Sequence, residues 1–402
     1  MQDMTISATG HDYTPVRAAM QGYVDSGILS GVSYAVLEGR TLADLQCVGW
    51  ADRESRTPLR PDHLFRIFSN TKLVTSCAVL LLVEDGRLGL DDPIGEYIPQ
   101  LAHPRVLRPG AVSLDDTEPA NGPITVRHLL SHSAGLSYGL LDPGSLMYQA
   151  YIERKVLNPA TPLAAMMDVL GELPLLFHPG TSWEYSVATD VLARLIEVVS
   201  GQRFDNFLQA RILSPLGMTD TGFVVPDGDR HRLAAYYRGA DRINQMLPGL
   251  TRLDNSPYPG AYLNDVPRLS GGGGLVSTLG DMVALLRSLV PGGATLLKAD
   301  TLAEAMRNQL ADGVTLRFAS GPLAGKVHGL LGAVTQAPSA LDPAASVGEL
   351  QWGGIAGTHW WISPRTGLAG VLMTQRLMAF WHPYAFDFKR LVYQAAGASQ
   401  RS

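Results

Sequence analysis

One short pattern in this chain predicts nucleophilic catalysis: a serine and a lysine three residues apart, at the start of an apolar segment. Ser69-Asn70-Thr71-Lys72 is the chain's only Ser-x-x-Lys, and residues 73–83 are apolar on nearly every face, which is typical of a helix in the protein interior. Residues i and i+3 of a helix are neighbours, so Ser69 and Lys72 would point the same way. Burial disfavours the charged ammonium, and a neutral amine can accept a serine proton. The alternative is that Ser69 caps the helix and Lys72 lies on its surface.

The N-terminus of this predicted helix would also place the Ser69 N–H where an oxyanion could form. A second candidate donor is the Ile355 N–H in Gln351-Trp352-Gly353-Gly354-Ile355, which lies on a predicted strand. Two glycines weaken a strand unless another backbone or a ligand must approach closely, and a bound ester carbonyl is such a ligand. The alternative for this segment is a β-bulge.

Tyr185 is the candidate for proton relay. It lies in Trp183-Glu184-Tyr185-Ser186, just before a helix predicted over residues 189–201, and its hydroxyl could reach the Ser69 oxygen. The alternative is an aromatic side chain that packs at the start of that helix.

The predicted elements place strands at both ends of the chain and helices between them. Apolar periodicity and end signals predict helices over 14–28 (Thr14 as cap, Pro15 at the first position), 69–86, 124–130 (Thr125 as cap), 189–201, 204–213, 282–289, 301–310 and 385–396. Strands are predicted over 31–37, 42–50, 328–335, 349–362 and 368–375. This order predicts an α+β fold. An antiparallel sheet flanked by helices would form one domain (1–65 and 290–402), a mainly helical domain would span 66–289, and the active site would lie in the cleft between them.

Composition excludes several partners. Of 402 residues, 46% are hydrophobic and 17% charged, and the net charge of -5 leaves no basic patch for nucleic acid. The N-terminus lacks the features of a secretory signal, and no apolar run reaches membrane-spanning length, so we expect a cytoplasmic protein with no membrane partner. Cys47 and Cys77 are expected to be reduced packing residues. No cofactor and no metal are expected.

Four other patterns are weaker candidates. Gly135-Leu136-Ser137-Tyr138-Gly139 matches a nucleophile elbow but has no predicted strand before it. His128 and His132 have the spacing of a zinc pair without a third ligand, and Gly271-Gly272-Gly273-Gly274 lacks the Lys-Ser/Thr of a phosphate loop. The last pattern is aromatic: Trp360, Trp361 and Trp381 could line an acyl pocket or pack in the core.

In their order and spacing, Ser69-x-x-Lys72, Tyr185-Ser186-Val187 and Trp352-Gly353-Gly354 resemble the penicillin-recognising serine hydrolases. The pattern is most similar to the class C β-lactamase-like esterases (family VIII carboxylesterases), which the statin-type acyltransferases resemble. Segments 124–136, 177–186, 214–223 and 270–278 also look like recurrent stretches of this family, so the resemblance covers about residues 15–395. It implies a β-lactamase and penicillin-binding-protein-like fold, Ser69 as the acylated nucleophile, and Lys72 with Tyr185 as its base pair.

Two positions depart from the β-lactamase pattern. Val187 stands where Tyr-x-Asn has its Asn, and Trp352-Gly353-Gly354 stands where the pattern has Lys-Thr-Gly. The replaced residues would hold the amide and carboxylate of a β-lactam, which Val and Trp cannot do. The resemblance therefore implies a serine carboxylesterase for small, short-acyl esters, with water or an alcohol as acceptor. The candidate substrate-binding residues are Trp352, Gly353, Gly354, Val187 and Tyr138.

Three alternatives remain open: a dedicated acyltransferase, an amidase or β-lactam hydrolase of the same fold, and a catalytically silent binding protein. An intact set of Ser69, Lys72 and Tyr185 argues against the last. The sequence does not indicate the oligomeric state.

Overall fold

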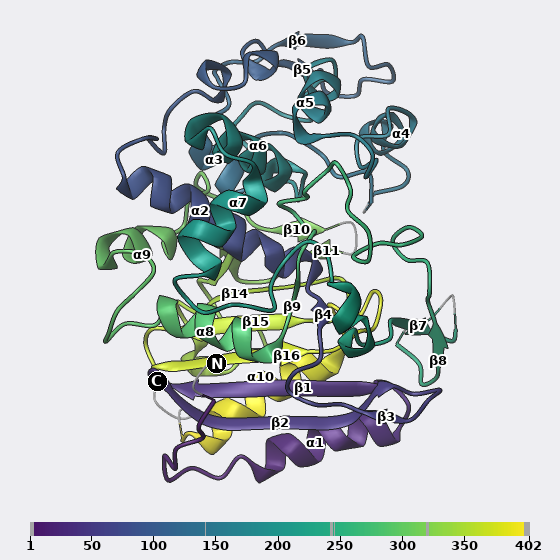
Figure 1. Ribbon diagram of the computed structural model, residues 1–402. Coiled ribbons are helices and arrows are strands. Elements are labelled where there is room, and N and C mark those ends of the chain that lie inside the picture. Colours follow the sequence, from purple (N-terminus) through teal and green to yellow (C-terminus); the bar gives the residue numbers. More distant parts are fainter. Residues whose placement is uncertain (1–3, 141, 242–243, 245, 319–320, 398–402) are drawn as a thin grey trace.

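An eight-stranded antiparallel sheet forms one end of the molecule, and its strands come from the two ends of the chain (Figure 1). The computed structural model describes residues 4–140, 142–241, 244, 246–318 and 321–397. The strands, in their order across the sheet, are β12 (Lys326–His328), β13 (Ala333–Thr335), β14 (Leu350–Gly353), β15 (His359–Ser363), β16 (Leu368–Met373), β1 (Gly31–Glu38), β2 (Thr41–Asp52) and β3 (Thr57–Pro58). This sheet and its flanking helices confirm the predicted α+β class.

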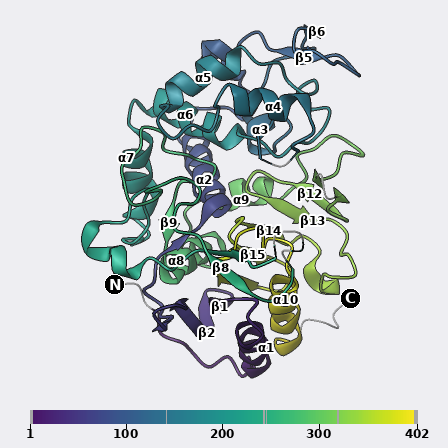
Figure 2. The ribbon, with the colours of Figure 1, turned by 90° about the vertical axis from the view of Figure 1, so that its right-hand side faces the viewer.

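Helices cover both faces of the sheet, which is why its central strands are apolar on both sides. Helices α1 (Thr14–Asp25) and α10 (Pro383–Ala395) lie against one face, and α8 (Leu279–Leu289) packs on the other (Figures 1 and 2). Alternate side chains of β1 therefore enter different cores. Val32, Tyr34 and Val36 pack with α1 and α10, whereas Ala35 and Leu37 join the larger core that continues into the helical region.

The helical region lies beyond that second face, around α2 (Figure 1). Its helices are α2 (Thr71–Glu84), α3 (Val126–Leu130), α4 (Leu146–Glu153), α5 (Leu163–Gly171), α6 (Ala188–Ser200) and α7 (Phe204–Leu208), which continues as a π-helical turn (Gln209–Leu213); α9 (Ala299–Ala305) follows α8. Nearly all of α2 is buried, and it packs against α6. Four two-stranded pairs complete the fold: β4 (Phe65–Arg66) with β9 (Val276–Ser277), β5 (Arg105–Leu107) with β6 (Thr117–Pro119), β7 (Tyr237–Gly239) with β8 (Leu250–Arg252), and β10 (Arg317–Phe318) with β11 (Gly321–Pro322).

The proposed division into domains remains a prediction. All eight strands of the large sheet fall in the segments 1–65 and 290–402, yet α8 of the segment 66–289 packs on β1 and β16. One apolar core also runs from the sheet through the helical region. Cys47 and Cys77 are free thiols, half-buried and buried respectively. Within the described ranges, no helix has both the length and the apolar character needed to cross a membrane.

Several predicted elements were wrong in detail. The strand predicted over 349–362 is the pair β14 and β15, joined by a turn in which Gly357 has φ 82°. The strand predicted over 328–335 is likewise the β12–β13 hairpin. The helix predicted over 301–310 is the shorter α9, and Thr14 is the first residue of α1 rather than its cap, because the N-cap is Tyr13.

Candidate active site

Ser69 lies in a tight turn that leads directly into α2. The short strand β4 pairs with β9, and the Ile67 N–H donates to Leu275 O. These backbone hydrogen bonds fix the chain just before the serine. Phe68 then takes a positive φ of 42°, and Phe68–Asn70 form a 3-10 turn that precedes α2. This geometry places Ser69 at the N-terminal end of a buried helix and on the surface of a cavity.

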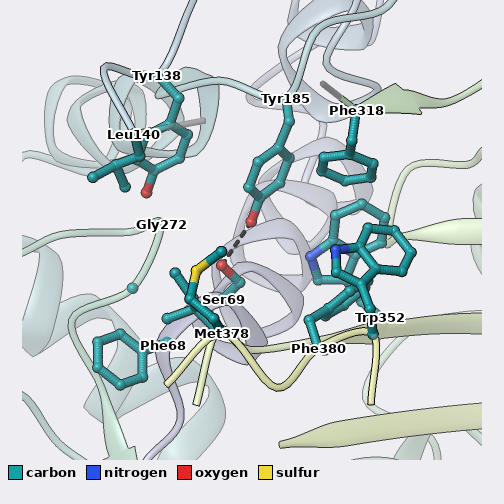
Figure 3. A pocket seen from close by; sticks show the side chains of 14 residues that line it. Phe68, Ser69, Tyr138, Leu140, Tyr185, Gly272, Phe318, Trp352, Met378 and Phe380 are labelled. Atoms are coloured by element: carbon teal, nitrogen blue, oxygen red, sulfur yellow. Dashed lines mark hydrogen bonds between the residues drawn. The ribbon is translucent and has the colours of Figure 1, made fainter. Parts of the chain in front are cut away.

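Tyr185 and Lys72 converge on the Ser69 oxygen (Figure 3). The Tyr185 O–H donates to Ser69 Oγ over 2.6 Å, and Lys72 Nζ lies 3.4 Å from the same oxygen. Lys72 is 6% exposed, its Nζ donates to Gly272 O over 2.7 Å, and it lies 4.6 Å from the centre of the Tyr185 ring. A hydroxyl, a phenol and an amine in this arrangement can exchange protons without solvent.

Aromatic rings fix the Tyr185 side chain. Tyr138 stacks on it at 5.4 Å and 20°, Trp352 packs against it at 5.4 Å, and His132 lies 5.0 Å away. His132 is itself held by the Ser186 N–H, which donates to its Nδ1. The phenol therefore has little freedom to turn away from Ser69.

The two buried imidazoles near the site are not competing acids or bases. Burial lowers the pKa of His132 well below its usual value, and the charges of His328 and Lys72 lower it further. Burial also lowers the pKa of His328, to about 4. Both rings are neutral at neutral pH, so Lys72 and Tyr185 are the groups beside Ser69 that can handle its proton.

The end of β14 lies next to the backbone that precedes Ser69. A Cβ on Gly354 would be 2.6 Å from Ile67 O, so only glycine lets the two backbones approach this closely. Ile355 follows in the turn after β14 rather than on a strand, and it lines the cavity. The N–H groups of Ser69 and Ile355 donate to no other group within the described part of the chain. Both are therefore available to a substrate oxygen.

A cavity of about 130 Å³ opens above Ser69 and is mainly apolar. In Figure 3, Phe68, Tyr138 and Leu140 lie on one side of Ser69, and Phe318, Trp352 and Phe380 lie on the other. The remaining lining residues are Tyr185, Gly272, Gly273, Gly353, Ile355, Met378 and Trp381. No charged side chain lines the cavity among the residues that the structure describes.

The structure brings most, but not all, of the predicted substrate-binding residues to this cavity. Trp352, Gly353 and Tyr138 line it, whereas Gly354 packs behind it against Ile67. Val187 is 0% exposed and does not reach the cavity, because the first turn of α6 directs it into the core. Its contribution is limited to the absence of the amide that Asn would supply.

About half of the residues that line the cavity were not predicted from the sequence. Phe68, Leu140, Phe318, Met378 and Phe380 lie outside the main helices and the large sheet, where no periodicity marks a side chain as inward-facing. Of the three tryptophans considered for an acyl pocket, Trp381 lines the cavity, whereas Trp360 and Trp361 do not and are almost fully buried.

The weaker motifs have structural explanations. Ser137 lies in a loop with no strand before it, and its backbone bonds to Tyr151 and Val187. His128 completes the capping box of α3 with Thr125. No group of three or more His, Cys, Asp or Glu side chains suited to a metal occurs among the described residues. The glycine run 271–274 forms the turn whose Gly272 carbonyl accepts from Lys72.

Comparison with known proteins gives a consistent result. A family model described as Beta-lactamase matches residues 16–392. The chain is 34% identical over 339 residues to esterase EstB of Burkholderia gladioli, covering 81% of each protein. It is 33% identical over 346 residues to lovastatin esterase of Penicillium rubens, covering 80% of this chain and 82% of that one. The solved structure of EstCE1, titled a hydrolase with promiscuous acyltransferase activity, matches with a TM-score of 0.80 and 26% identity over 94% of this chain and 98% of that chain.

Proposed function

Because the chain belongs to the β-lactamase family, within which its relatives include esterases, we propose that it is a serine carboxylesterase that cleaves small, uncharged, short-acyl esters through an acyl-enzyme on Ser69. The observation that carries this proposal is the 2.6 Å contact between Tyr185 Oη and Ser69 Oγ, beside a buried Lys72 and beneath a cavity with no charged lining in its described part.

Acylation follows from the positions of these groups. The Lys72–Tyr185 pair accepts the Ser69 proton, and Ser69 Oγ attacks the ester carbonyl carbon. The negative charge that develops on the carbonyl oxygen is stabilised by the N–H groups of Ser69 and Ile355. The pair then returns the proton to the departing alkoxide, which leaves as an alcohol, and the acyl group remains bound to Ser69.

The second half-reaction depends on the acceptor. Water, or an alcohol, gives its proton to the same pair and attacks the acyl carbon, and Ser69 leaves with the proton that the pair returns. The aromatic lining excludes bulk water and suits the hydrocarbon part of an alcohol as well as it suits an ester. EstCE1 is described as having promiscuous acyltransferase activity, and we expect acyl transfer here as a side reaction of hydrolysis.

Substrate charge is the main discriminator. A β-lactam or peptide brings a carboxylate and an exocyclic amide, and a buried carboxylate without a cation costs several kcal/mol. An unpaired amide adds roughly 1–3 kcal/mol. Trp352 supplies an apolar wall, and no charged side chain lines the described part of the cavity. Neutral esters need only the two oxyanion donors and this wall.

Rates on two substrates with one enzyme sample test the proposal. We expect kcat/KM for p-nitrophenyl butyrate to exceed that for nitrocefin by more than a hundredfold, and benzyl alcohol to accept acetyl groups from vinyl acetate. Mass spectrometry should locate the acyl adduct on Ser69, and Ser69→Ala should abolish turnover whereas Ser137→Ala should not. A larger kcat/KM with nitrocefin, or an adduct on Ser137, would contradict the proposal.

A further inference from the structure

A buried carboxylate next to Lys72 has no part in the reaction described so far. Asp190, the third residue of α6, is 0% exposed, and neither of its carboxylate oxygens accepts a hydrogen bond from any group in the described ranges. An isolated buried carboxylate is strongly unfavourable unless a positive charge lies close to it. The position of Asp190 therefore requires an electrostatic partner.

Lys72 is a suitable partner, because its Nζ and the Asp190 carboxylate both lie next to Gly272. A Cβ on Gly272 would lie 2.8 Å from Asp190 Oδ2 and 3.3 Å from Lys72 Nζ. Lys72 Nζ also donates to the carbonyl of the same glycine over 2.7 Å. The carboxylate and the amine thus face each other across one residue of backbone, close enough for their charges to interact but without a direct ion pair.

Other positive charges around this position are weaker candidates. His132 and His328 are neutral at neutral pH, because burial and the charge of Lys72 lower the pKa of both imidazoles. The charge of Arg268 acts on the Tyr138 hydroxyl, but Arg268 makes no ion pair with Asp190 in the described part of the chain. The N-terminus of α6 favours an acidic side chain in its first turn, but it supplies only a partial charge.

The two tyrosines that face Lys72 are also affected. The Tyr138 hydroxyl would lie 3.3 Å from a Cβ on Gly272, and its pKa is raised well above its usual value, first by burial and then by the charge of Asp190. It therefore remains a phenol and cannot neutralise the carboxylate. The Tyr185 O–H donates to Ser69 Oγ rather than to Asp190.

We propose that Asp190 is a positioning residue that acts across Gly272 to stabilise the positive charge on Lys72, and so sets the pH at which the Lys72–Tyr185 pair can accept the Ser69 proton. The inference rests on the proposed function. When the serine proton moves to the pair, positive charge forms or is retained on Lys72, and the fixed carboxylate stabilises it without any movement of the protein. Asp190 itself touches neither substrate nor Ser69.

Asp190→Asn tests this role, because it keeps the shape of the side chain and removes its charge. Without the carboxylate, a proton leaves either member of the pair more readily, whether it leaves the Lys72 ammonium or the Tyr185 phenol. In either case the acid limb of the kcat/KM profile, where the rate falls as pH decreases, moves to lower pH. Opposite charges separated by one residue of backbone, at an effective dielectric of about 20, favour the charged pair by an order of magnitude or more. We expect a shift of about one to two pH units. The pH-independent value of kcat/KM should fall about tenfold, because the Lys72–Tyr185 pair is less basic. KM should change less than twofold.

Asp281→Asn is the matched control. Asp281 is also a buried aspartate at the third position of a helix, α8, but its carboxylate accepts from Thr221 and the Asp220 N–H, outside the cavity. Its replacement should lower the melting temperature without moving the acid limb. Asp190→Ser removes the charge with a smaller side chain, for use if the amide is not tolerated at position 190.

If the acid limb of the kcat/KM profile does not move in Asp190→Asn or in Asp190→Ser, the proposal is overturned. It is also overturned if neither variant folds, because Asp190 would then be needed only for the fold. Failure of the proposed function has a different signature. In that case the wild-type protein itself would not hydrolyse p-nitrophenyl butyrate, or Ser69→Ala would retain activity.

Discussion

The 2.6 Å contact between Tyr185 Oη and Ser69 Oγ, with Lys72 Nζ 3.4 Å from the same oxygen, predicts that the two residues act as one unit. Tyr185→Phe removes only the hydroxyl, and Lys72→Ala removes the amine together with the methylene chain that carries it. If each is needed for the same proton transfer, each single variant should lose about 10³ in kcat/KM, or about 4 kcal/mol of transition-state stabilisation. The double variant should lose little more, because the first change already disables the unit.

Independent contributions would give a different result. The double variant would then lose about 10⁶, or about 8 kcal/mol, so a double-mutant cycle separates the two cases by about 4 kcal/mol. Independent sites add within roughly 0.5 kcal/mol, so the difference is easily resolved. The assay is the initial rate with p-nitrophenyl butyrate for the wild type, both single variants and the double variant. An additive cycle would refute the coupled pair.

Tyr138→Phe is the matched control for this cycle. Tyr138 stacks on Tyr185 at 5.4 Å and lines the same cavity, but its hydroxyl does not bond to Ser69 in the described structure. Loss of its hydroxyl should change kcat/KM by less than tenfold. A loss as large as that of Tyr185→Phe would mean that any phenol of the cavity is essential, and the special position of Tyr185 would be disproved.

Two further predictions concern stability. Lys389→Met should lower the free energy of unfolding by about 3–5 kcal/mol, because Lys389 Nζ donates over 2.8 Å to the fully buried Glu349, whose carboxylate would lose its cation. In urea unfolding, the neighbouring Arg390→Met should cost less than about 1 kcal/mol, since its partner Asp387 is a surface residue; equal losses would contradict the argument. His328 has a pKa of about 4 when folded and 6.5 as the reference value, so the unfolded chain binds more protons between these pH values. His328 alone should therefore lower stability by about 3 kcal/mol as pH decreases through this window, and His328→Asn should remove that part of the slope, whereas the part due to His132 and His359, whose pKa values burial also lowers, should remain.

The proximity of the candidate reacting groups could be predicted from sequence because their geometry is local or their residue types are unusual. Ser69 and Lys72 meet through helix periodicity alone, and the glycines after Trp352 indicate a close approach of two backbones. In the structure the partner at Gly354 is the Ile67 carbonyl, a contact across more than two-thirds of the chain that no local pattern encodes.

The cavity was much less predictable. Phe318 comes from the short strand β10, and Trp352 comes from β14. Met378 and Phe380 come from the segment between β16 and α10. Three separate parts of the chain therefore form this wall. Each segment is too short or too irregular to have a periodicity. Only the tertiary fold decides which of their side chains face Ser69.

Backbone strain gathers around the same serine, and it explains part of the precision of the site. Phe68, His132, Tyr262 and Met378 are non-glycine residues with φ of 42°, 56°, 65° and 58°. Such conformations cost on the order of 1–3 kcal/mol each and persist only when the surroundings enforce them. Here the Phe68 ring packs edge-on against Tyr262 at 5.7 Å, and the Tyr262 O–H donates to Gly273 O, beside the carbonyl that accepts from Lys72. The strained turn before Ser69 and the glycine turn that holds Lys72 are thus locked to each other, and one continuous set of contacts positions the proposed nucleophile and its proposed base.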